Sequence, residues 1–207
     1  MITRMSRDIS SFFIVQGIIY NEDREVYEYS FEILFSTILS FIVLAVIAVV
    51  SNTVMYTTLY MIGFIPLRLI AGGYHAKNHF RCFTLLILTY SLFLVIIKYI
   101  AYDYLIETTV LCLLISIIQI FIFSPSEDEN KPVTEKETDI FRKRSRYVII
   151  GYTVLVGVMS FFLRDLRFAL SITLGNLTVA ISLLASHMKV KHKKKDFRNV
   201  QRGGHDK

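Results

Sequence analysis

The stretch FEILFSTILSFIVLAVIAVVSNTVMYTTLYMIGFIPLRLI, residues 31–70, contains two long apolar runs separated only by Ser51-Asn52. A helix needs about 20 residues to cross the hydrocarbon core of a bilayer. The two runs, Phe31–Val50 and Thr53–Ile70, are close to that length. Because so short a link makes consecutive helices antiparallel neighbours, the stretch predicts a membrane-spanning helical hairpin.

Four further apolar segments follow this hairpin. They are Cys82–Ile100, Leu105–Phe123, Tyr147–Leu163 and Phe168–His187. The 207 residues are 54% hydrophobic, with a mean hydropathy of +0.51, which is too apolar for an ordinary soluble domain. The links Ala101–Tyr104 and Arg164–Arg167 are again short. We therefore predict an all-α integral membrane protein with six transmembrane helices.

Lysine and arginine residues are concentrated in alternate connections. Of the 23, 20 lie in residues 1–30, 68–81, 124–146 and 189–207. The other three are Lys98, Arg164 and Arg167. Since positively charged loops are retained on the cytoplasmic side, we expect both termini and residues 68–81 to be cytoplasmic.

Residues 1–28 contain an apolar run too short to cross the membrane. We expect an amphipathic helix lying in the cytoplasmic interface. The residues expected to face the acyl chains are Met5, Ile9, Phe12, Phe13 and Ile19. The alternative is a first helix that caps the bundle on its cytoplasmic side. Residues 29–188 then form the membrane domain.

Two basic regions flank the last two predicted spans. The loop 124–146 changes from acidic to basic and ends in Arg142, Lys143, Arg144 and Arg146, and a basic tail occupies residues 189–207. The four loop cations are candidates for binding anionic membrane lipid or an acidic substrate. The alternative for both regions is that they only fix the topology.

The connection RLIAGGYHAKNHFRC, Arg68–Cys82, carries unusually many reactive side chains. Pro66 lacks a backbone donor, and Gly72-Gly73 can adopt conformations closed to other residues. We expect the second span to end or kink here. Irregular backbone at membrane depth is tolerated only where protein or water satisfies it, as in substrate sites.

Three interpretations of this connection compete. His75 and His79 have the i, i+4 spacing of a zinc site, but the general-base Glu of such motifs is absent and Lys77 lies between them. Alternatively, Cys82 is a nucleophile in the first turn of the third span, where unpaired N–H groups stabilise a thiolate. In the third interpretation the thiol and the imidazoles are ordinary interface residues.

A nucleophilic Cys82 needs a base, and the straight-helix geometry favours His79, which lies one turn away. His75 lies about 10.5 Å of helical rise from Cys82. It therefore reaches the thiol only if the chain folds back after Gly72-Gly73.

Three other polar residues fall in or beside the predicted spans. Arg68 either shapes the site or extends its side chain to the headgroups. Asn176 is expected to make an interhelical hydrogen bond. Cys112 is expected to be an inert packing residue.

The string from Arg68 to Cys82, together with the chain length, the six predicted spans and the basic loop, resembles the accessory gene regulator B (AgrB) family. These are membrane cysteine endopeptidases that process a quorum-sensing propeptide. The resemblance implies Cys82 as nucleophile and His75 as general base. It gives supporting roles to Arg68 and Gly73. Gly72 forms the expected turn together with Gly73. His79 has no role in that pattern and remains the alternative base.

The implied reaction is cleavage of a small, amphipathic, AgrD-like propeptide through a thioester on Cys82, followed by closure of a lactone or thiolactone. No cofactor, metal or nucleic acid is expected. The resemblance also implies the bacterial cell membrane and, by itself, a homodimer. The alternatives are a peptide exporter and a membrane protein that binds a peptide without cleaving it.

Overall fold

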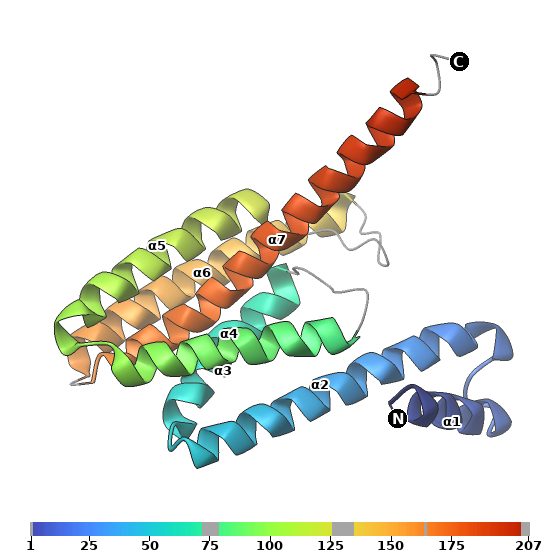
Figure 1. Ribbon diagram of the computed structural model, residues 1–207, viewed down its shortest axis with the longest axis horizontal. Helices are drawn as coiled ribbons and strands as arrows, with labels where there is room; N and C mark the ends of the chain where they lie inside the picture. The colour runs from blue at the N-terminus through green and yellow to red at the C-terminus, as the bar shows by residue number, and fades with distance from the viewer. Residues whose placement is uncertain (1, 72–78, 126–134, 164, 204–207) are drawn as a thin grey trace. The chain divides into compact units, whose positions relative to one another are not determined.

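The computed structural model describes residues 2–71, 79–125, 135–163 and 165–203, with the backbone alone for residues 2, 79–83, 135–136 and 189–203. The described residues form only helices (Figure 1), which confirms the all-α class. The α-helices are α1 (Ile2–Val15), α2 (Arg24–Val50), α3 (Val54–Ala71), α4 (His79–Tyr99), α5 (Leu105–Phe123), α6 (Glu135–Phe162) and α7 (Arg167–Gly203). Two short 3₁₀ helices, η1 (Asn21–Asp23) and η2 (Tyr102–Tyr104), precede α2 and α5.

Within the described residues, five helical segments are long and apolar enough to cross a membrane. They are Asn21–Val50, Val54–Ala71, Tyr102–Phe123, Glu137–Phe162 and Arg167–Met188. These segments fit a multi-pass membrane protein. In α4 the apolar segment found among described residues is the shorter Thr84–Tyr99. The third predicted span, Cys82–Ile100, corresponds to α4 and is not among these five segments.

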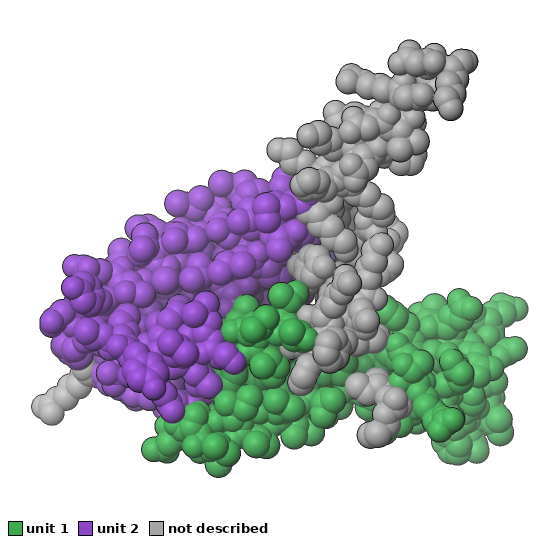
Figure 2. Space-filling model, viewed as in Figure 1, with its two compact units in different colours: residues 1–52, 76–90 green, residues 53–75, 91–207 purple. Residues whose placement is uncertain are grey.

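The chain divides into two compact units, residues 1–52 with 76–90 and residues 53–75 with 91–207 (Figure 2). In the second unit, α7 packs against α3, α5 and α6. Of the apolar part of α7, 61% is buried, against 33% for α3 and 22% for both α5 and α6. Thus α7 is the central helix of this unit.

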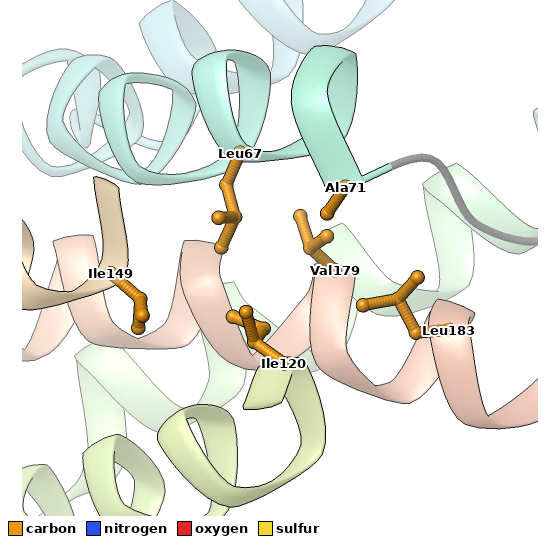
Figure 3. Packing of buried hydrophobic residues seen from close by; sticks show 6 residues of the cluster. All are labelled: Leu67, Ala71, Ile120, Ile149, Val179 and Leu183. Carbon is orange, nitrogen blue, oxygen red and sulfur yellow. The ribbon is translucent and has the colours of Figure 1, made fainter. Parts of the chain in front are cut away.

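The core of the second unit is apolar and joins four helices. Leu67 and Ala71 of α3 meet α7 where Ile120 of α5 and Ile149 of α6 also converge (Figure 3). The α7 members of this cluster are Val179 and Leu183. Nearer the start of α7, Ala169 and Ile172 pack with Val156 of α6. Close packing of this kind is the main source of helix association in lipid.

Two glycines let α3 and α7 approach closely. A Cβ atom at Gly63 would collide with the carbonyl oxygen of Ile172, and one at Gly175 would collide with the carbonyl oxygen of Tyr60. Both obstacles are backbone atoms of the facing helix and cannot rotate away. The crossing of α3 and α7 therefore depends on small residues, as is common between membrane helices.

In the first unit, α1 packs against α2. The ring of Phe13 stacks on Phe31 with 5.7 Å between centroids, and Arg24 donates to Ser11 Oγ at 3.2 Å. Among the residues expected to face lipid, Met5 and Phe12 are exposed, whereas Ile19 is buried. Only part of the predicted apolar face is therefore available to a bilayer.

Three helices extend beyond the predicted spans. α2 begins at Arg24, seven residues before the predicted start, and α7 continues to Gly203 through most of the basic tail. α6 begins at Glu135, so the Arg142–Arg146 cluster lies on a helix and not in the predicted loop. Hydropathy marks the part of a helix that lies in lipid, whereas these extensions are polar.

Candidate functional site

Arg68 lies in the last turn of α3, three residues before the helix ends at Ala71. Its guanidinium donates a hydrogen bond from Nη1 to Ser182 Oγ of α7 at 2.6 Å. The bond is part-buried, and the sequence neighbours Leu67 and Leu183 belong with Ala71 to the core cluster. Arg68 is thus hydrogen-bonded to the central helix of this unit.

Pro66 lies inside α3 without ending it. A proline cannot donate to the carbonyl four residues earlier, which here belongs to Ile62. The hydroxyl of Tyr152 in α6 donates to that carbonyl. A neighbouring helix therefore supplies the missing donor, so α3 continues to Ala71 and ends directly before Gly72.

A second side-chain bridge joins α3 to α7. The hydroxyls of Tyr60 and Thr178 share a hydrogen bond of 2.9 Å. Thr178 and Ser182 are four residues apart and so lie on one face of α7. Neither Thr178 nor Ser182 was predicted as a site residue. The signal in the sequence is a pair of small hydroxyl side chains four residues apart within an apolar segment.

The remaining predicted site residues follow α3. Gly72, Gly73 and His75 lie outside the described residues. His79 is the first residue of α4 and Cys82 the fourth, so the backbone places both in the first turn of that helix. The side chains of His79 and Cys82 lie outside the described part. Among the described residues, no three His, Cys, Asp or Glu side chains form a group suited to a metal ion.

The four predicted substrate-binding cations of α6 fall into two pairs. Arg142 forms an ion pair with Asp139 at 2.9 Å. Arg146 donates to the carbonyl oxygen of Phe121, near the end of α5, at 3.1 Å and lies over the Phe121 ring. Lys143 and Arg144 are exposed. Exposed cations are the better placed of the four to meet a ligand.

Asn176 is fully buried in α7, and neither its amide nitrogen nor its oxygen has a hydrogen-bond partner among the described residues. The predicted interhelical hydrogen bond is therefore wrong. Cys112 of α5 is a buried free thiol, as expected of a packing residue.

The family model for accessory gene regulator B, AgrB, matches residues 6–183. The chain belongs to the AgrB family. The match runs from α1 to the core position Leu183 of α7, and so includes Arg68, Cys82 and Ser182. AgrB proteins are known for peptidase-like processing in quorum sensing and are associated with an AgrD-like propeptide. Neither the curated proteins nor the solved structures provide a significant match.

For an AgrB protein, the helices above fit a location in the cell membrane. The match covers all five candidate spans except the last residues of α7. AgrB membership therefore applies to the helical bundle as a whole, including the α3–α4 connection.

Proposed function

We propose that this AgrB protein is a cysteine endopeptidase that removes the C-terminal part of an AgrD-like propeptide. The observation that carries the proposal is the family match over residues 6–183. It is supported by the position of Cys82 in the first turn of α4. The unpaired N–H groups of a helix start and the helix dipole favour the thiolate, the nucleophilic form of cysteine.

The reaction proceeds in two acyl transfers. The Cys82 thiolate attacks a peptide carbonyl of the propeptide, the C–N bond breaks, and His75 donates a proton to the departing amine. The N-terminal part of the propeptide is then held as a thioester. A thiol or hydroxyl side chain of this part gives its proton to His75 and attacks the thioester carbonyl, which closes a ring and breaks the bond to the Cys82 sulfur. An active site that lies at the membrane surface and excludes water protects the thioester from hydrolysis.

Several supporting roles follow from the same proposal. Gly72 and Gly73 form the bend that brings His75 to Cys82, and Arg68 contacts the substrate from the end of α3. Lys143 and Arg144 bind acidic groups of the propeptide or of membrane lipid. We further propose that α4 also crosses the membrane, which brings the number of spans to six. Both termini and the α3–α4 connection then lie in the cytoplasm. A homodimer is the proposed assembly.

The location of Arg68 favours a peptidase over an exporter. Transporters generally hold their ionisable residues near the middle of the membrane. Arg68 instead lies in the last turn of α3, near His75 and Cys82 in the sequence.

Purified protein in liposomes, mixed with the propeptide, tests the proposal. We expect the wild type to release the C-terminal fragment and Cys82→Ala to release none, with both proteins equally folded and inserted. Cys112→Ala is the matched control, since it removes the other thiol, and should retain activity. Cleavage by Cys82→Ala would end the thiol-peptidase proposal.

A further inference from the structure

The bond between Arg68 and Ser182 connects a predicted site residue to a residue with no assigned role. Its length of 2.6 Å is short for a bond between a guanidinium nitrogen and a hydroxyl. Bonds with a charged partner are among the stronger ones in proteins. Arg68 and Ser182 are 114 positions apart in the sequence, so only the packing of α3 on α7 brings them together.

The helix that carries Ser182 is a firm support. α7 is the most buried of the spans, and Leu183, the next residue, is fully buried in the core cluster. On the other side of the bond, Leu67 immediately precedes Arg68 and packs in the same cluster. The two backbone positions are therefore held by the core, and the bond restricts the orientation of the long arginine side chain.

A guanidinium is planar and carries five N–H donors in a rigid fork. A hydrogen bond at one nitrogen restricts the position and rotation of the group, and so narrows the directions of the other donors. Such donors suit the oxygen acceptors of a peptide, namely carbonyl and carboxylate oxygens. An arginine held in place binds them with less loss of side-chain entropy than a free one.

We propose that Ser182 is a positioning residue for Arg68, holding its guanidinium ready for oxygen atoms of the propeptide. This inference rests on the proposed function, because it assumes that Arg68 contacts the substrate. It assigns part of the substrate-binding geometry to α7, through a residue 114 positions after Arg68 in the sequence.

Thr178 offers a matched control within the same pair of helices. Its hydroxyl bonds with Tyr60 at 2.9 Å, which is likewise a side-chain bridge between α3 and α7. Thr178→Val removes that bridge but leaves Arg68 untouched. A purely structural role for Ser182 would therefore make Ser182→Ala and Thr178→Val behave alike.

The first measurement is the steady-state kinetics of propeptide cleavage in liposomes. We expect Ser182→Ala to raise KM about 10-fold, in line with the loss of a hydrogen bond to a charged group, with a smaller change in kcat. Ser182→Thr, which keeps the hydroxyl, should restore most of the affinity, and Thr178→Val should leave KM unchanged. In the Arg68→Lys background, Ser182→Ala should have no further effect, since it acts through the guanidinium. Equal KM values for Ser182→Ala and wild type would overturn the proposal.

The second measurement does not depend on the proposed reaction. Phenylglyoxal modifies free guanidinium groups, and mass spectrometry of the modified protein reports the rate at Arg68. We expect Ser182→Ala to increase this rate several-fold and Thr178→Val to leave it unchanged. An unchanged rate in Ser182→Ala overturns the positioning role. The two proposals can also fail separately. If the wild-type protein cleaves no propeptide but Ser182→Ala still raises the modification rate at Arg68, the proposed function is wrong and the positioning of Arg68 by Ser182 is confirmed.

Discussion

At the scale of single residues, Asn176 shows most clearly what a sequence leaves open. An asparagine within an apolar segment predicts a buried amide, and the structure buries it completely. A sequence does not reveal which atoms face that amide. Here α7 places it on the same side as Ile172 and Val179, which belong to apolar clusters. The predicted hydrogen bond therefore finds no partner within the described residues.

The missing partner has a consequence for stability. A buried amide without partners costs about 1–3 kcal/mol, so Asn176→Leu, which is similar in size and apolar, should raise the thermal unfolding midpoint in detergent. Leu177→Asn is the matched control, since it adds an amide at the next position of α7 and should lower the midpoint. A lower midpoint for Asn176→Leu would show that the amide is satisfied, contrary to the structure.

A second residue-scale prediction separates the two histidines. Helix geometry favours His79 as the base for Cys82, whereas the family pattern favours His75. We expect His75→Ala to reduce the rate of propeptide cleavage by at least about 100-fold, as loss of a general base does, and His79→Ala to reduce it only slightly. The reverse order would assign the base to His79. Equal losses, with activity removed by a chelator and restored by zinc, would revive the metal-site hypothesis.

At the scale of elements, α3 shows how tertiary structure overrides a local signal. Pro66 lies inside α3 and leaves the carbonyl of Ile62 without a backbone donor, and the hydroxyl of Tyr152 in α6 donates to that carbonyl. That compensation involves residues 90 positions apart and cannot be read from the segment itself.

This compensation predicts a suppressor relationship. Tyr152→Phe should lower stability by about 0.5–1.5 kcal/mol, the net contribution of a typical hydrogen bond, because the carbonyl of Ile62 loses its donor. Pro66→Ala restores a backbone N–H to α3, so adding it to Tyr152→Phe should recover most of the loss. Thermal unfolding of the two single variants and the double variant measures this coupling. Strictly additive effects of the two substitutions on the unfolding midpoint would contradict this compensation.

At the scale of the whole molecule, hydropathy predicted the helical class and the approximate positions of the spans, because lipid demands long apolar helices. It did not identify α7 as the central helix. The relevant signals are Gly175, which allows close approach to α3, and the hydroxyl residues Thr178 and Ser182, which bond to it. Their partners lie on another helix, and pairing them requires the fold.

The candidate site was predictable only as a list of residues. The string from Arg68 to Cys82 indicates a cysteine peptidase through its likeness to AgrB, and the family match agrees with that likeness. The support that Arg68 receives from α7 was not predictable, since Ser182 has no distinctive neighbours in sequence.

The central claim is that Cys82 forms a thioester with the propeptide. The most direct test uses a propeptide whose ring-closing Cys or Ser is replaced by Ala, so that the acyl group cannot be transferred onward. Intact-mass spectrometry after rapid denaturation should show the protein carrying the N-terminal part of the propeptide. Peptide mapping should place the adduct on Cys82, and hydroxylamine should remove it. Release of the C-terminal fragment with no adduct on Cys82, or the same adduct in Cys82→Ala, would contradict the account.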